Sequence, residues 1–176
     1  MVYVLDTNIF RKLLDHFPKK GKAFEVVWEA LDEAIANKTV VSVDECFNEI
    51  ANHYSSDSEN FKWVKSRKEM FLNPTNAESL ILKELFQKSK MQESVHTKNI
   101  LNNRPSADAY LVAKAKTLNA TLVTSETYKP HSAQLPNICE ELNVKYISYD
   151  DFMEMLSSEV SIATGTESNL PCLLLF

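Results

Sequence analysis

Two acidic residues directly follow strand-like segments of this 176-residue chain. Asp6 comes after the apolar run 2–5, and Glu126 comes just after the β-rich segment 121–124. In open parallel α/β sheets, ligands bind beyond the carboxyl ends of the strands. We therefore expect both carboxylates at one edge of a sheet. The simpler roles are a turn or helix-capping residue for Asp6 and a solvated loop acid for Glu126.

Asp108 lies within the apolar stripe of the predicted helix 107–118, together with Leu111 and Val112. A carboxylate on a buried helix face costs free energy unless it is paired or bound to a metal ion. The first turn of a helix also favours negative charge, because the helix dipole is positive there. Asp108 is therefore either a metal ligand or a first-turn acid at the edge of the core.

Glu49 and Glu45 lie one turn apart on the helix predicted after the strand 39–43. Glu49 flanks the apolar stripe of that helix, whereas Glu45 points further away from it. Ser42 and Glu45 also match the S-x-x-E capping box that opens helices, which assigns Glu45 a structural role. Glu49 is therefore the better candidate for a functional carboxylate, and a solvated position on the helix surface is its simpler interpretation.

Four carboxylates, those of Asp6, Glu49, Asp108 and Glu126, are thus expected near one edge of the sheet. Carboxylates that share a pocket raise one another's pKa, because their negative charges repel. A divalent cation removes that cost, and ligands that are all oxygen favour Mg²⁺ or Mn²⁺ over Zn²⁺. The chemistry suited to such a site is phosphoryl transfer, in which the metal polarises a phosphodiester, generates hydroxide from water and stabilises the leaving oxygen.

Alternating strands and helices must position these acids. The sequence predicts strands at 2–5, 39–43, 121–124 and 144–147, and helices at 24–36, 43–54, 107–118, 136–142 and 149–156. The segment 55–103 is predicted as a polar, helical insert with a break at Asn73-Pro74. Strands that alternate with helices imply a parallel sheet with right-handed crossovers.

The composition, with 44% hydrophobic and 24% charged residues, is that of a soluble globular protein. We expect one domain over 1–157 and an extension over 158–176, whose apolar end packs on the same chain or on a partner. Only 2 glycines are present, and neither GxGxxG nor GxxxxGK[ST] occurs, so a glycine-rich phosphate loop is not expected. The 3 cysteines form no CxxC pair, and the start has no basic leader or membrane-length apolar run, which favours the cytoplasm.

The formal net charge of −5 argues mildly against a general nucleic-acid coat protein, because binding to phosphates is usually carried by a basic surface. It does not exclude a nuclease, whose own carboxylates make the total more negative. A nuclease needs cations near its acids to hold phosphates. Arg11, Arg104 and Lys129 are the candidates, and each is also an ordinary type of solvated surface residue.

At these residues the chain resembles the PIN-domain nucleases, from residue 1 to about residue 156. The matching pieces are Leu5-Asp6-Thr7-Asn8, Val40-Val41-Ser42 followed by Glu49-Ile50, the segment 107–115, the segment 120–126 and the segment 135–144. No single piece is specific, but their order is that of the family. The resemblance is weakest between 55 and 103, where the long insert points to a divergent subgroup.

The resemblance implies a three-layer α/β/α fold with a central parallel sheet of about four to five strands. It implies metal ligands at Asp6, Glu49, Asp108 and Glu126, ordered by Thr7, Asn8, Thr124 and Ser125. Glu126 departs from the family, which usually has Asp or a smaller polar residue there. The implied activity is that of a Mg²⁺- or Mn²⁺-dependent endoribonuclease, the toxin of a toxin–antitoxin pair, with RNA as substrate, a protein antitoxin as partner and a homodimeric state.

Two other functions remain open from the sequence. A phosphatase that forms an aspartyl-phosphate also begins with a strand and an aspartate, but it usually carries a second aspartate two residues on, where this chain has Asn8. The non-enzymatic alternative is a PIN-like module that binds RNA or a protein without cleaving. Acids at all four expected positions speak against it. No association with a membrane is expected.

Overall fold

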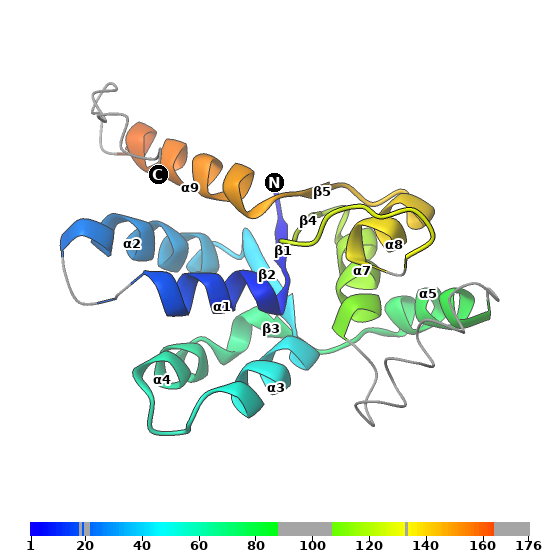
Figure 1. Ribbon diagram of the computed structural model, residues 1–176, viewed down its shortest axis with the longest axis horizontal. Coiled ribbons are helices and arrows are strands. Elements are labelled where there is room, and N and C mark those ends of the chain that lie inside the picture. The colour runs from blue at the N-terminus through cyan, green and yellow to red at the C-terminus, as the bar shows by residue number, and fades with distance from the viewer. Residues whose placement is uncertain (18, 20–21, 88–106, 133, 164–176) are drawn as a thin grey trace.

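Five short parallel strands form the centre of the molecule (Figure 1). The computed structural model describes residues 1–17, 19, 22–87, 107–132 and 134–163. The strands are β1 (Tyr3–Leu5), β2 (Val40–Val43), β3 (Phe71–Leu72), β4 (Thr121–Val123) and β5 (Tyr146–Ile147). They lie in the order β3-β2-β1-β4-β5, and every neighbouring pair is parallel. The strands therefore all end at one side of the sheet, its carboxyl edge, and β1 ends at its centre.

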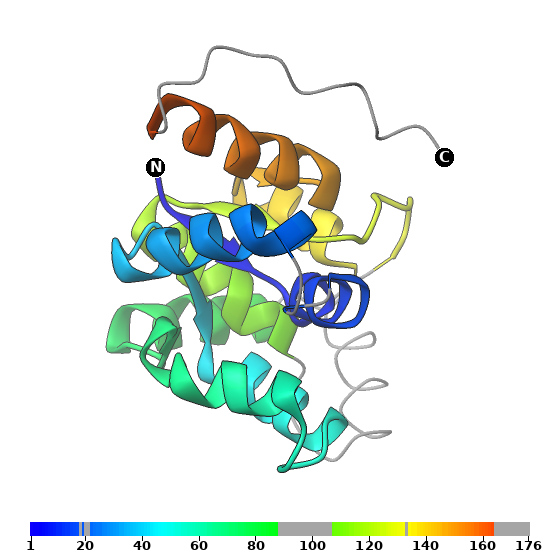
Figure 2. The ribbon, with the colours of Figure 1, turned by 90° about the vertical axis from the view of Figure 1, so that its left-hand side faces the viewer.

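Helices cover both faces of this sheet, as the three-layer prediction requires. They are α1 (Thr7–His16), α2 (Lys22–Ala36), α3 (Asp44–His53), α4 (Glu59–Ser66), the short 3-10 helix η1 (Lys68–Met70), α5 (Asn76–Gln87), α7 (Ala107–Leu118), α8 (Leu135–Leu142) and α9 (Tyr149–Ala163). Figure 1 shows α1, α2 and α9 on one side of the sheet and α5, α7 and α8 on the other. Figure 2 shows α9 packed along α2. No helix in the described ranges has both the length and the apolar character needed to cross a membrane.

The predicted α/β class with a parallel sheet is confirmed, while three elements differ from the prediction. The strand β3 lies inside the segment 55–103, which was predicted as helical with a break at Asn73-Pro74; its two residues are too few to show a strand pattern. The helix α1 follows Asp6 and was not predicted. The last helix continues to Ala163, into the segment 158–176 that was expected to be an extension, and residues 164–176 lie outside the described part of the chain.

The helix α7 is buried on almost all sides, rather than along one stripe. Ala109, Ala113 and Lys114 are buried in addition to the predicted apolar positions. Leu118, the last residue of the helix, is 41% exposed. The wider burial arises because α7 packs against β1, β2, α5 and α8 at once. The helix that carries Asp108 is therefore held from several directions.

The predicted capping box at Ser42 is wrong, because Ser42 is still part of β2. Its hydroxyl donates a hydrogen bond to the carbonyl oxygen of Leu5 at 2.7 Å, which links β2 to the end of β1. The cap position of α3 is Val43, which has no capping side chain. Ser42 thus stabilises the strand end that carries Asp6.

Candidate active site

The carboxylate of Asp6 is buried at the end of the central strand. The residue is 3% exposed, and its backbone N–H donates to the carbonyl of Val123 in β4 at 3.1 Å. The Thr124 hydroxyl donates to Asp6 Oδ2 at 3.1 Å, and the side-chain amide of Asn8 donates to the same oxygen at a longer 3.4 Å. These two side chains therefore fix the orientation of the Asp6 carboxylate.

Two further carboxylates act on Asp6 electrostatically. The pKa of Asp6 is raised from 3.8 to about 7, most strongly by burial and next by the negative charge of Asp108. The hydrogen bond from Thr124 lowers this pKa, and the charge of Glu126 raises it. The structure thus brings Asp6, Asp108 and Glu126 into one electrostatic site, from the end of β1, the first turn of α7 and the loop after β4.

Glu126 also has a structural role. Its Oε2 accepts the backbone N–H of Leu135, the first residue of α8, at 2.8 Å. The first N–H groups of a helix have no partner inside it, and the cap residue Gln134 supplies no capping side chain. Glu126 therefore caps α8 from a distance. The hydroxyl of the neighbouring Ser125, expected to order the ligands, is buried and has no hydrogen-bond partner among the described residues.

Glu49 lies on an exposed face of α3 and is tied to α1. The Thr7 hydroxyl donates to Glu49 Oε2 at 2.6 Å. Because Thr7 directly follows Asp6, this hydrogen bond brings Glu49 to the same strand end. Cys46, one turn earlier on α3, is fully buried, and burial, with the charges of Asp6 and Glu49, raises the pKa of its thiol. A thiol held neutral in this way is a poor nucleophile, so Cys46 belongs to the core.

Glu45 is more buried than the sequence predicted. Its Oε2 is fully buried and has no hydrogen-bond partner among the residues that the structure describes. Burial raises the pKa of the Glu45 carboxyl, and Lys114 and Glu78 act on it as charged neighbours. The prediction that Glu45 points away from the core is therefore wrong, since one of its oxygens is buried and charged residues of α5 and α7 act on it.

The four predicted acids do not form a tight cluster. Within the described ranges, no three His, Cys, Asp or Glu side chains lie close enough together to hold one metal ion. Glu49 and Glu126 each use a carboxylate oxygen in a hydrogen bond to the protein, with Thr7 and Leu135. The four side chains still fit a hard divalent cation, because such cations prefer oxygen ligands and all four offer carboxylate oxygens. The charges of Asp108 and Glu126 also disfavour ionisation of Asp6, and a bound cation offsets that cost.

Of the three residues predicted to contact phosphates, Arg11, Lys129 and Arg104, the structure describes the first two, which lie in different surroundings. Arg11 lies one turn before Asp15 on α1, and Asp15 accepts a hydrogen bond from the Tyr54 hydroxyl at 2.7 Å. The charge of Arg11 acts on Tyr54, so Arg11 faces α3. Lys129 is exposed in the loop after β4. Arg104 lies outside the described residues.

Lys12 is a cation that the sequence analysis did not select. Its Nζ lies 5.0 Å from the centroid of the Tyr149 ring, at the start of α9. Residues four apart share one face of a helix, so Lys12 lies on the same face of α1 as Asn8, which contacts Asp6. Arg11 follows Asn8 by three residues and is also its neighbour on the helix, so the contact with Tyr149 distinguishes Lys12 and the spacing alone does not.

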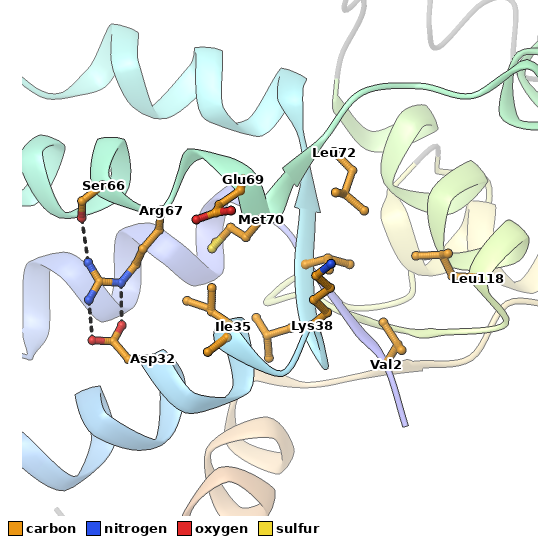
Figure 3. Close-up of a pocket in the computed structure, with 13 residues that line it drawn as sticks. Val2, Asp32, Ile35, Lys38, Ser66, Arg67, Glu69, Met70, Leu72 and Leu118 are labelled. Carbon is orange, nitrogen blue, oxygen red and sulfur yellow. Dashed lines mark hydrogen bonds and ion pairs between the residues drawn. The ribbon is translucent and has the colours of Figure 1, made fainter.

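A cavity of about 710 Å³ lies at the opposite edge of the sheet (Figure 3). Val2 and Val40 line it at the starts of β1 and β2, and the ion pair between Arg67 and Asp32 lies at one side. None of the predicted site residues lines this cavity. The cavity and the acids are therefore separate features of the molecule.

The chain is similar to two solved structures of VapBC proteins. It is 16% identical to a chain in the crystal structure of VapBC2 from Rickettsia felis bound to a DNA fragment from their promoter, over 84% of this chain and 98% of that chain, with a TM-score of 0.48. It is 18% identical to a chain in a 2.2 Å structure of VapBC-1 from nontypeable Haemophilus influenzae, over 85% of this chain and 99% of that chain, with a TM-score of 0.46.

Comparison of the sequence with curated proteins gives no match. A family model, in contrast, matches residues 3–160, which include every strand and nearly all of the described helices. The chain therefore belongs to the family described as a domain of unknown function, DUF4411.

Proposed function

We propose that this protein is a divalent-metal-dependent ribonuclease of the PIN type. The position of Asp6 carries the proposal. Its carboxylate is 3% exposed at the end of the central strand, and the negative charges of Asp108 and Glu126 help to raise its pKa to about 7. A buried carboxylate beside two others is unfavourable near neutral pH, and a bound divalent cation offsets that cost.

In this proposal Asp6, Glu49, Asp108 and Glu126 hold Mg²⁺ or Mn²⁺. The chemistry that such a cation would supply is polarisation of the phosphodiester, activation of water and stabilisation of the leaving oxygen. The residues of the chain prepare the site for it. Thr124 and Asn8 hold the Asp6 carboxylate in place, and Thr7 holds that of Glu49.

The order of motifs that resembles the PIN-domain nucleases supports the choice of substrate class. From the same resemblance we propose that the enzyme is the toxin of a toxin–antitoxin pair that acts in the cytoplasm, with a protein antitoxin as partner and a homodimer as its state. The phosphatase alternative has less support, because Asn8 donates a hydrogen bond to Asp6 where a second acid is needed.

Cleavage of RNA by the purified full-length protein tests the proposal. We expect cleavage with Mn²⁺ or Mg²⁺ and none in EDTA. Asp6→Asn and Asp108→Asn should abolish cleavage while the circular dichroism spectrum stays that of the parent. Asp57→Asn is the matched control, since Asp57 is exposed in the loop between α3 and α4, and it should cleave like the parent.

Two outcomes contradict the proposal. Equal cleavage by the parent, Asp6→Asn and Asp108→Asn means that the site is assigned wrongly. Tight RNA binding without cleavage under any divalent metal favours the non-enzymatic binding module instead.

A further inference from the structure

The ammonium group of Lys12 is held at a defined place beside the proposed site. Its Nζ lies 5.0 Å from the centroid of the Tyr149 ring, a distance at which a cation is attracted to the ring face. No hydrogen bond or ion pair joins Lys12 to a carboxylate among the described residues. Lys12 therefore carries a positive charge that the protein positions but does not neutralise.

Lys12 and Asp6 are connected along one face of α1. Asn8 donates its side-chain amide to Asp6 Oδ2, and Lys12 follows Asn8 by one helical turn, a rise of about 5.4 Å. Arg11 is one residue earlier but faces Tyr54 and Asp15. Lys12 thus lies against Tyr149 whereas Arg11 acts on Tyr54, so the two neighbouring cations have different partners.

Tyr149 places this cation on the β5 side of the acids. In the sheet, Val123 of β4 is opposite Ile147 of β5, and Tyr149 follows Ile147 by two residues. The Tyr149 hydroxyl is buried without a hydrogen-bond partner among the described residues, while the face of the ring lies against Lys12. Glu126 follows β4, which lies between β1 and β5, so Glu126 and Tyr149 are on the same side of Asp6.

We propose that Lys12, supported by the ring of Tyr149, binds a backbone phosphate of a single-stranded RNA whose cleaved bond lies at Asp6. This inference rests on the proposed ribonuclease function. A single strand is favoured over a duplex because duplex binding requires many neutralised phosphates, whereas this protein has a net charge of −5 and acids along the same edge. Lys12 is thus a substrate-binding residue, and Tyr149 positions it.

Equilibrium binding of a short, fluorescently labelled single-stranded oligoribonucleotide tests the inference. The measurement is made in EDTA, where no cleavage is expected, over a series of salt concentrations that begins low. Lys12→Gln should bind several-fold more weakly than the parent. Its slope of log K against log salt should be smaller by about 0.7, the value for one phosphate contact to a single strand.

Two comparisons separate a phosphate contact from a change in fold or total charge. Lys38→Gln removes the same charge at the opposite edge of the sheet, beside the cavity in Figure 3, and should keep the slope of the parent. Tyr149→Leu removes the ring face and should weaken binding, whereas Tyr149→Phe keeps the ring face and should bind like the parent.

The inference fails if the parent does not bind the oligoribonucleotide, or if Lys12→Gln and Lys38→Gln have the same slope, even when the parent cleaves RNA. It also fails in its choice of a single strand if a duplex of the same sequence binds as tightly. A parent that binds with the expected loss in Lys12→Gln but never cleaves contradicts the ribonuclease proposal and leaves the phosphate contact supported.

Discussion

The hydroxyl of Thr124 joins Asp6 to the loop that carries Glu126. It donates to Asp6 Oδ2 at 3.1 Å, and its oxygen accepts the backbone N–H of Glu126 at 3.1 Å. One buried side chain at the end of β4 thus contacts two of the proposed ligands. The relative position of these two carboxylates depends on a hydroxyl group, and not only on the sheet.

Replacement of Thr124 by valine should therefore weaken both the fold and the activity. Valine keeps the shape of the side chain but leaves the Glu126 N–H without its partner and Asp6 with one donor fewer. We expect a loss of about 1–3 kcal/mol in the free energy of unfolding. We also expect cleavage to be about 10-fold slower, which corresponds to a barrier raised by about 1.4 kcal/mol. Urea unfolding and RNA cleavage measure the two effects. Thr124→Ser keeps the hydroxyl and should recover most of both; equal losses in the two variants would argue against the hydrogen bonds as the cause.

The raised pKa of Asp6 predicts how the stability of the metal-free protein changes with pH. The folded state holds a proton on Asp6 up to a pH of about 7, whereas the unfolded state loses it near pH 3.8. Because the folded state then binds more protons than the unfolded state, the free energy of unfolding should fall as the pH rises between these two values. Above pH 7 the cost of the buried charge is fully present.

Asp6→Asn should remove that fall, because asparagine does not titrate. In EDTA at pH 8 the variant should be more stable than the parent by a few kcal/mol, since one pKa unit corresponds to about 1.4 kcal/mol, and at pH 4 the two should be nearly equal. Urea unfolding at both pH values gives the difference, and the other titrating groups cancel because they are common to both proteins. Parallel curves for parent and variant over this range would show that Asp6 ionises normally.

Two substitutions of Glu126 separate its structural role as the cap of α8 from its proposed role as a metal ligand. Glu126→Gln keeps an amide oxygen that can accept the Leu135 N–H, but it loses the negative charge that a metal ligand needs. We expect this variant to unfold at nearly the urea concentration of the parent and to lose most of its cleavage. Glu126→Ala removes the cap as well and should cost about 1 kcal/mol of stability. Full cleavage by Glu126→Gln would restrict Glu126 to its role as the cap of α8.

The sequence predicted the frame of the molecule well, because the frame depends on local pattern. The apolar run before Asp6 predicted β1, and the apolar stripe that includes Asp108 predicted α7. The strand β3 was missed because two residues carry no periodicity. The role of Lys12 was missed because its contact with Tyr149 joins two elements that are far apart in the sequence, α1 and α9.

The S/T-x-x-E pattern shows the limit of local signals most clearly. It occurs at Ser42, where the hydroxyl bonds to Leu5 instead and no box forms. It occurs again at Thr75 and Glu78, where the box does form: the Glu78 N–H donates to the Thr75 hydroxyl at 3.3 Å, and Glu78 Oε2 accepts the Thr75 N–H at 3.0 Å. The pattern is the same, and the neighbouring strand decides between the two outcomes.

Glu78 also forms a buried ion pair with Lys114, and this pair gives the last prediction. Both residues are 2% exposed, and Lys114 Nζ lies 2.9 Å from Glu78 Oε1 and donates to the carbonyl of Asn73 at 2.9 Å. The pair fastens α5 to α7, the helix that carries Asp108. Removal of one partner leaves an uncompensated buried charge, which typically costs about 3–5 kcal/mol.

Lys114→Met alone and Glu78→Gln alone should each lower the free energy of unfolding by an amount of that order. The double variant should be more stable than either single variant, because neither charge then remains unpaired, while glutamine retains an acceptor for the Thr75 N–H. Urea unfolding of the four proteins gives the coupling between the two sites. Additive losses would mean that each side chain acts through separate contacts. A double variant that folds stably yet cleaves more slowly than the parent would show that the pair sets the position of α7, and with it of Asp108, beyond holding the fold together.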